Sequence, residues 1–566
     1  MWKSAVFVLY NLAILVQSSD ETSRIVNITQ GPVRGHIDPE GGVYTFYNIP
    51  YATAPTGPNR FKAPLPPPVW FSTFDAVNRG IICIQPFVSM ALTMQEDCLV
   101  VNVFVPDTEE TNIPVLVMVH GGAYQMGFGL SEEFKDLVRT KKLIVVSFNY
   151  RLGVHGFLCL GTEGAPGNAG LKDQVAALHW VNRNIARFGG NPEDVTLGGC
   201  SAGSGSIDIL TLSSVTTGLF KKVIMESGVS TSAVGVQINP IENAKRYARL
   251  FNVNDVDDLN SLEEFYTTAT FDQLVSRIDA IMNNKNVEVW FAPCIERDIG
   301  QETVIKRAPL DVMTEGNYTK IPMLYGFTDM DGWLRVPQFE QWKVAMNEKF
   351  SDFLPNELYF ESDEVKEEFA QEIKEFYFGD EPITDDSIET YVRYFSDILF
   401  VQPMLRSLST RVETLGDTVY LFEYSFVDEN TISLPNSDAR GADHCFQLFA
   451  VKDEDVSYST EEYIQMKQTV RQYWLNFILT GSPTTATDTL QWPPANARGS
   501  PYMSLGPVIS QKEDIFQYTT AFWDKIYEKY YRGPVLISDN ETDGAVSLMI
   551  SNVMFAAVLL SLYLNV

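Results

Sequence analysis

Histidine and positive charge are both scarce in this chain of 566 residues. It has five histidines, and 42 lysines and arginines against 72 aspartates and glutamates, which gives a formal net charge of −30. The acidic residues are spread through the sequence and no basic patch stands out, which argues against nucleic acid or an anionic membrane surface as a partner. The sequence also lacks an internal repeat, a heptad run and a low-complexity tract. We therefore expect one large α/β unit with insertions.

Cysteine is sparse as well, with six residues. Cys83 and Cys98 enclose a short loop, and we expect them to form a disulfide. The other four lie in apolar or motif contexts, and we expect them to be buried free thiols; they are Cys159, Cys200, Cys294 and Cys445.

Both ends of the chain have the composition of targeting segments. Residues 1–18 have a charged start, an apolar middle and a small-residue exit, which predicts a secretory signal peptide. In the secretory pathway three Asn-x-Ser/Thr triplets are candidate glycosylation sites; they are Asn27, Asn317 and Asn540. Residues 536–566 form a polar stalk and an apolar tail with no Lys or Arg after it. This favours a GPI-anchor signal, with a retained membrane helix and a docked amphipathic terminus as alternatives.

The remaining residues, 20–535, alternate short apolar runs with helical patterns. Residues 99–105, 113–119 and 143–148 are β-branched runs too short for ordinary helices, and they predict strands buried on both faces. Residues 168–188 repeat apolar side chains at helical spacing. The alternation predicts a large, mostly parallel sheet flanked by helices. Residues 26–33 and 43–46 predict a small antiparallel sheet at the N-terminus.

The segment Gly199-Cys200-Ser201-Ala202-Gly203 follows one of the apolar runs. In a Gly-x-Ser-x-Gly turn between a strand and a helix, the serine is held in a strained, exposed pose. The amide groups and the positive end of the following helix then point to where negative charge develops during acyl transfer. Such pentapeptides also occur by chance in loops, so the rest of the site decides the interpretation.

The rest of a hydrolase site stands in the expected order along the chain. His120-Gly121-Gly122-Ala123 directly follows a predicted strand, and a glycine-rich loop there predicts an oxyanion hole. We expect its donors to be the amides of Gly122, Ala123 and Ala202. No metal and no organic cofactor is expected.

A serine nucleophile needs a base, and His444 is the only histidine after Ser201. Its orienting carboxylate should lie between them in sequence. The turn after the apolar run 322–327 offers two candidates. We choose Asp331, which precedes a glycine, and keep Asp329 in reserve.

With these motifs in place, residues 25–530 resemble type-B carboxylesterases of the cholinesterase-like group within the α/β-hydrolase fold. The resemblance also rests on Glu96-Asp97-Cys98-Leu99, Asn149-Tyr150-Arg151 and the blocks 167–174 and 188–192. It implies the triad Ser201, Asp331 and His444, the Cys83–Cys98 disulfide, and two ion pairs, Arg60 with Glu96 and Arg151 with Asp173.

Departures from the family pattern bear on the substrate. Relatives usually carry glutamate where Cys200 stands, and the triad acid is usually glutamate instead of Asp331. The stretch from Ile84 to Asp97 has no tryptophan to bind quaternary ammonium by cation–π attraction, which argues against acetylcholine. We expect a serine carboxylesterase for neutral, mostly apolar esters, active as a monomer or homodimer. A non-catalytic adhesion or ester-sequestering protein is the alternative.

Overall fold

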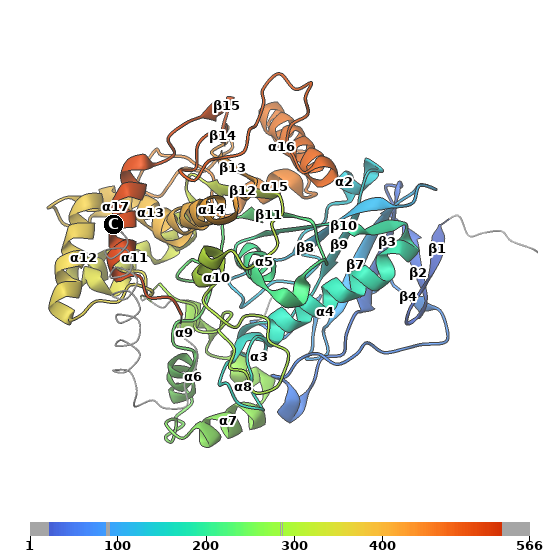
Figure 1. The fold of residues 1–566 in the computed structure, drawn as a ribbon, viewed down its shortest axis with the longest axis horizontal. Helices are drawn as coiled ribbons and strands as arrows, with labels where there is room; N and C mark the ends of the chain where they lie inside the picture. The colour runs from blue at the N-terminus through green and yellow to red at the C-terminus, as the bar shows by residue number, and fades with distance from the viewer. Residues whose placement is uncertain (1–21, 87–90, 283–284, 286, 535–566) are drawn as a thin grey trace, which may run out of the picture.

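The computed structural model of the chain describes residues 22–86, 91–282, 285 and 287–534. The predicted signal peptide, the C-terminal tail and Asn540 lie outside this range. The centre of the molecule is a 13-stranded sheet with the strand order β1-β2-β3-β7-β9-β8-β10-β11-β12-β13-β14-β15, and β4 pairs with β2 (Figure 1). A separate pair, β5-β6, forms a second small sheet.

The middle of the main sheet is parallel and its two edges are antiparallel. The N-terminal antiparallel strands are continuous with this sheet, because β3 pairs with β7. The strands are β1 Ser23–Ile28, β2 Gly31–Ile37, β3 Val43–Pro50, β4 Phe74–Asp75, β5 Ile81–Ile82, β6 Thr93–Met94, β7 Val100–Pro106, β8 Ile113–Val119, β9 Ile144–Phe148, β10 Gly190–Cys200, β11 Lys222–Glu226, β12 Met323–Thr328, β13 Val419–Tyr424, β14 Tyr502–Leu505 and β15 Ile509–Lys512.

Helices cover both faces of the sheet, and a further group of helices lies at one end of the molecule (Figure 1). They are α2 Lys135–Arg139, α3 Gly153–Phe157, α4 Ala169–Asn184, α5 Ala202–Leu212, α6 Pro240–Arg249, α7 Leu259–Thr268, α8 Phe271–Val275, α9 Ile278–Met282, α10 Pro309–Glu315, α11 Phe339–Glu348, α12 Asp363–Phe378, α13 Ile388–Ser396, α14 Gln402–Leu415, α15 Phe446–Val451, α16 Glu461–Thr480 and α17 Gln517–Tyr530. In the described residues, none of these helices is both long and apolar enough to span a bilayer.

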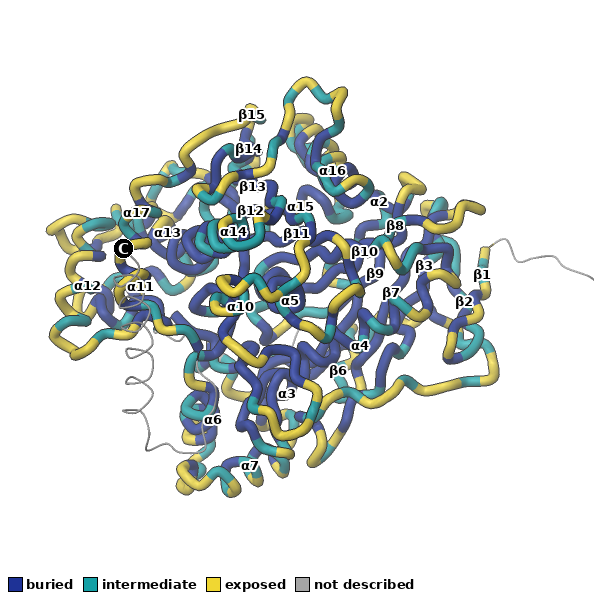
Figure 2. Tube along the Cα trace, viewed as in Figure 1, coloured by how far each residue is buried: buried dark blue, intermediate teal, exposed yellow. Residues whose placement is uncertain are grey.

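The alternation of side chains along β8 explains the two-faced core. Val115 and Val117 pack into the cluster that contains the apolar residues of α4 and α5. Leu116 and Met118 point to the other face, into the cluster built with α2 and α16. Side chains alternate between the two faces of a strand, so an unbroken apolar run is needed where both faces are covered. β8 is buried along most of its length (Figure 2).

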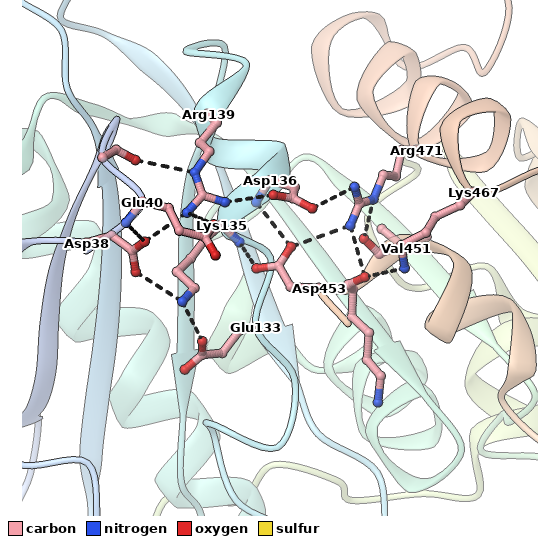
Figure 3. Close-up of polar contacts among 12 residues, drawn as sticks. Asp38, Glu40, Glu133, Lys135, Asp136, Arg139, Val451, Asp453, Lys467 and Arg471 are labelled. Atoms are coloured by element: carbon pink, nitrogen blue, oxygen red, sulfur yellow. Dashed lines mark hydrogen bonds and ion pairs between the residues drawn. The ribbon is translucent and has the colours of Figure 1, made fainter. Parts of the chain in front are cut away.

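A network of charged groups ties the edge of the sheet to α16 (Figure 3). Asp38 pairs with Lys135 at 3.0 Å and with Arg139 at 2.8 Å, and Arg471 of α16 pairs with Asp136 at 2.9 Å. Asp453, two residues beyond α15, accepts hydrogen bonds from the first two amides of α2 at 2.6 and 3.1 Å. The network therefore anchors the C-terminal end of the short segment that contains α15.

Candidate active site

The turn that carries Ser201 lies between β10 and α5. Ser201 has φ 58° and ψ −128°, a conformation that is strained for a residue with a side chain. A Cβ atom on Gly199 would lie 2.7 Å from the carbonyl oxygen of Val119, and one on Gly203 would lie 2.1 Å from it. Both glycines are required because the turn packs directly against the end of β8.

Asp331 and His444 meet beside this turn although they are far apart in sequence. The Nδ1 atom of His444 lies 2.8 Å from Oδ1 of Asp331, and the aspartate is fully buried whereas 17% of the histidine side chain is exposed. Oδ2 of Asp331 accepts hydrogen bonds from Oγ of Ser227 and from the amide of Thr328, both at 3.0 Å. The carboxylate is thus held on one side, with its other oxygen toward the imidazole.

Asp329, the reserve candidate, has a different place. Its Oδ1 accepts a hydrogen bond of 2.8 Å from the amide of Ala442, in the loop that leads to His444. Burial raises the pKa of Asp329 to about 7. Asp329 therefore supports the backbone of the histidine loop, and Asp331 contacts the imidazole.

The glycine-rich loop after β8 packs on the Ser201 turn. A Cβ on Gly121 would lie 2.7 Å from the carbonyl oxygen of Cys200. Gly122 and Ala123 have φ values of 112° and 54°, which turns the backbone sharply there. Within the described residues, the amides of Gly122 and Ala123 donate to no protein acceptor, and the amide of Ala202 is the first of α5, where helix amides have no intrahelical partner.

A cavity opens between these groups, and its lining includes Ser201, His444, Ala123 and Ala202. Most of the remaining wall is apolar; it includes Val229, Val234, Val289, Leu334, Leu399 and Phe400. The ring of Phe400 lies against His444 with the centroids 4.5 Å apart.

Two aromatic residues, Tyr266 and Phe291, do not line this cavity. Tyr266 and Phe291 are 0% and 1% exposed and belong to the hydrophobic core. Nothing in the local sequence marks Leu334, Leu399 and Phe400 as pocket residues, because their chain segments reach the cavity only through the fold.

The sequence model of the carboxylesterase family matches residues 22–523. This chain belongs to that family. Juvenile hormone esterase of Heliothis virescens is 29% identical over 549 residues, which cover 90% of this chain and 96% of that protein. Para-nitrobenzyl esterase of Bacillus subtilis (strain 168) is 33% identical over 495 residues, 83% and 92% of the two chains. A solved structure, juvenile hormone esterase from Manduca sexta with OTFP covalently attached, has a TM-score of 0.80 at 28% identity and covers 89% of this chain and 100% of that one.

The α/β-hydrolase fold is confirmed by these neighbours, and the chain is a carboxylic ester hydrolase. The ion pairs implied by the family resemblance are also present. Arg60 lies 2.9 Å from Glu96, and Arg151 lies 2.6 Å from the fully buried Asp173. Among the described residues, no cluster of three or more His, Cys, Asp or Glu side chains is suited to hold a metal ion.

The disulfides of this carboxylesterase correct the sequence analysis. Cys83 is bonded to Cys98, the partner expected for it. The prediction of four free thiols is wrong, because Cys159 is bonded to Cys294 and Cys200 to Cys445. These partners are 135 and 245 positions apart, so only the tertiary fold brings them together. Three disulfides are typical of proteins from oxidising, extracellular compartments.

Two neighbours of Ser201, Cys200 and Glu226, bear on the charge beside the nucleophile. Cys200 is bonded and uncharged. Glu226, whose backbone oxygen accepts from the amide of Ser201 at 2.8 Å, is fully buried. Burial raises the pKa of Glu226 well above its ordinary value, because it disfavours the charged form of the carboxyl group.

Proposed function

We propose that Ser201, His444 and Asp331 form the catalytic triad of a serine carboxylesterase for neutral, mostly apolar esters. The observation that carries the proposal is the 2.8 Å contact between His444 Nδ1 and the buried Asp331, in a cavity that His444 shares with Ser201. If Nδ1–H donates to Asp331, Nε2 is left as a proton acceptor, as a general base requires.

The proposed reaction has two stages. Ser201 Oγ attacks the ester carbonyl carbon while His444 takes its proton, and the resulting oxyanion accepts hydrogen bonds from the amides of Gly122, Ala123 and Ala202. The intermediate collapses, the carbon–oxygen bond to the alcohol breaks, and the imidazolium protonates the leaving alcohol. Water then loses a proton to His444 and attacks the acyl carbon. The bond from that carbon to Ser201 Oγ breaks, His444 returns the proton to the serine, and the acid is released. No metal or organic cofactor takes part.

The cavity wall supports the substrate class. Its side chains are mostly apolar. Cys200, at the position where relatives usually carry glutamate, is bonded and uncharged, so it offers no negative charge to a cationic alcohol. The names of the relatives, juvenile hormone esterase and para-nitrobenzyl esterase, add both kinds of ester to the panel that should be tested.

The deciding experiment is Ser201→Ala in the purified protein. We expect it to lose hydrolysis of a nitrophenyl or naphthyl ester, and His444→Ala to lose activity with an unchanged circular dichroism spectrum. Activity that survives Ser201→Ala would overturn the mechanism.

Titration with an organophosphate separates the alternatives. An esterase shows stoichiometric labelling and turnover, whereas a sequestering protein shows a burst of product followed by slow turnover. An adhesion protein shows no labelling. The complete set of triad residues favours the esterase.

We also propose that the chain is secreted, with residues 1–18 removed and residues 20–535 forming the enzyme domain. Asn27 and Asn317 are exposed and accessible to glycosylation, and the third candidate, Asn540, lies outside the described residues. For residues 536–566 a GPI signal stays the prediction. Release from cells by a phosphatidylinositol-specific phospholipase supports it, and retention supports a membrane helix.

Light scattering of the purified domain distinguishes a monomer from a homodimer.

A further inference from the structure

The Cys200–Cys445 disulfide joins the two chain segments that carry Ser201 and His444. Cys200 directly precedes Ser201 at the end of β10, and Cys445 directly follows His444 as the N-cap of α15. The Cα atoms of the two cysteines are 6.1 Å apart. The proposed nucleophile and the proposed base are therefore connected covalently through one residue on each side.

On the histidine side, an irregular segment leads to this connection. The chain forms no helix or strand between Tyr424, where β13 ends, and Phe446, where α15 begins. Near His444, Ala442 makes two hydrogen bonds to the turn after β12. Its amide donates to Oδ1 of Asp329 at 2.8 Å, and its carbonyl accepts from the amide of Met330 at 3.2 Å. A segment without a regular backbone hydrogen-bond ladder opens locally at a lower free energy than the sheet beside it, so a bond at its end restricts its movement.

The two ends of the α15 segment are held in different ways. Its far end is anchored through Asp453 by hydrogen bonds to the first two amides of α2, with Arg471 close by (Figure 3). Its near end is held by the disulfide at Cys445. Opening the disulfide leaves the anchor at Asp453 in place and removes the covalent tie at the end next to His444.

The first turn of α15 also reaches the buried carboxylate. Nε2 of Gln447 donates to Oγ of Ser227 at 2.9 Å, and Oγ of Ser227 donates to Asp331 at 3.0 Å. The same Nε2 atom lies 3.9 Å from Sγ of Cys200. A shift of α15 therefore disturbs both the imidazole and the hydrogen bonds that orient its carboxylate.

We propose that the Cys200–Cys445 disulfide is a positioning element for catalysis, which fixes His444 relative to Ser201, and that opening it lowers turnover reversibly without loss of substrate binding. The proposal rests on the triad proposed above. The effect should be confined to the reaction step, because the apolar cavity wall lies on segments that the disulfide does not join. A displacement of about 1 Å between reacting groups costs on the order of 100-fold in rate, so we expect a loss of about 10- to 100-fold in kcat.

A dithiol reductant opens the bond by exchange. Its thiolate attacks Sγ of Cys445, which is half-buried whereas Cys200 is 2% exposed, and Cys200 leaves as the thiolate. The second thiol of the reductant then attacks the mixed disulfide, closes the reductant's own disulfide and releases Cys445. Two electrons and two protons pass from the reductant to the protein.

The first test compares the double variant Cys200→Ala/Cys445→Ala with the matched control Cys159→Ala/Cys294→Ala. Both remove one long-range cross-link, but only the first removes the link between the triad segments. We expect the first to lose about 10- to 100-fold in kcat with KM changed by less than about threefold. The control should keep kcat within about twofold.

The second test uses the wild-type protein and so does not depend on whether the variants fold. The enzyme is treated with dithiothreitol, the opened cysteines are alkylated and mapped by mass spectrometry, and kcat is followed in parallel. We expect the loss of kcat to follow the opening of Cys200–Cys445, and reoxidation of an unalkylated sample to restore it. The Cys200→Ala/Cys445→Ala variant should show no further loss with reductant.

Two results would overturn the proposal. One is a folded Cys200→Ala/Cys445→Ala variant with kcat within twofold of the wild type. The other is a loss of wild-type activity that follows the opening of Cys83–Cys98 or Cys159–Cys294. Failure of the underlying triad is recognised separately, because Ser201→Ala would then retain turnover whatever the state of the disulfide.

Discussion

Replacement of Asp331 by asparagine tests the site most sharply, because the hydrogen bonds dictate how an amide must sit there. The Oδ2 position receives two donors, Oγ of Ser227 and the amide of Thr328. A backbone amide can only donate, so the side-chain oxygen of the introduced asparagine has to occupy that position. The NH2 group of the asparagine then faces His444.

This arrangement imposes the wrong tautomer on the imidazole. Nδ1 of His444 must accept from the asparagine NH2 group, so the proton moves to Nε2 and that atom no longer accepts the proton of Ser201. In addition, no negative charge remains to stabilise the imidazolium. In serine proteases the equivalent change lowers kcat by about 10⁴-fold, or about 5 kcal/mol, and we expect Asp331→Asn to lose a similar factor.

The assay is kcat and KM for a nitrophenyl ester, with active sites counted by organophosphate titration. The variant keeps the shape of the side chain, so its far-ultraviolet circular dichroism and KM should change little. A kcat within tenfold of the wild type would refute the proposed role of Asp331. The matched variant Asp329→Asn retains an oxygen for the amide of Ala442 and should lose less than about tenfold.

Three further predictions follow from the packing around the site. Gly203→Ala should abolish activity, because its Cβ would lie 2.1 Å from a backbone oxygen. In the control variant Gly80→Ala, the nearest atoms lie 3.5 Å from the new Cβ, and kcat should not change. Equal kcat in the two variants would contradict the tight packing of the Ser201 turn. Burial and two neighbouring arginines lower the pKa of His155 from 6.5 to about 3. Between these two pH values, His155 therefore binds a proton in the unfolded chain and stays neutral in the folded one. His155 alone should then lower the free energy of unfolding by about 1.4 kcal/mol per pH unit below 6.5. Urea titrations at pH 7, 6 and 5 should show that His155→Phe loses this contribution; the same pH dependence in wild type and variant would disprove it. Arg151→Met leaves the buried Asp173 without its partner and should lower the free energy of unfolding by about 3–5 kcal/mol, measured in urea. Arg151→Met/Asp173→Leu should recover most of this loss. A double variant no more stable than the single one would contradict this account.

The sequence predicted the fold class because its signals are local. The apolar runs at 113–119 and 143–148 match β8 and β9, Ile113–Val119 and Ile144–Phe148. The helical spacing at 168–188 matches α4 and the 3₁₀ turn Ile185–Phe188 that follows it. A strand buried on both faces has to be apolar at successive positions, so the pattern is visible without knowledge of its neighbours.

The site candidates were also accessible from the sequence, for a similar reason. A tight turn at Ser201 requires glycines at fixed offsets, and His444 is the only histidine after it. Their catalytic roles stay predictions until the variants are measured. The choice between Asp329 and Asp331 had a weaker basis in the sequence, since two carboxylates in one turn differ only in the direction each side chain takes.

What the sequence determined by itself is the order of the strands and helices along the chain and the residue types available for chemistry, because both depend on patterns within a few residues. Only the tertiary structure decided which distant groups meet. It joined Cys200 to Cys445 across 245 positions, selected Asp331 as the partner of His444, and brought Leu399 and Phe400 to the cavity. These contacts depend on how the packed sheet and helices bring together segments that are remote in sequence. A local sequence pattern does not indicate which remote segments will meet.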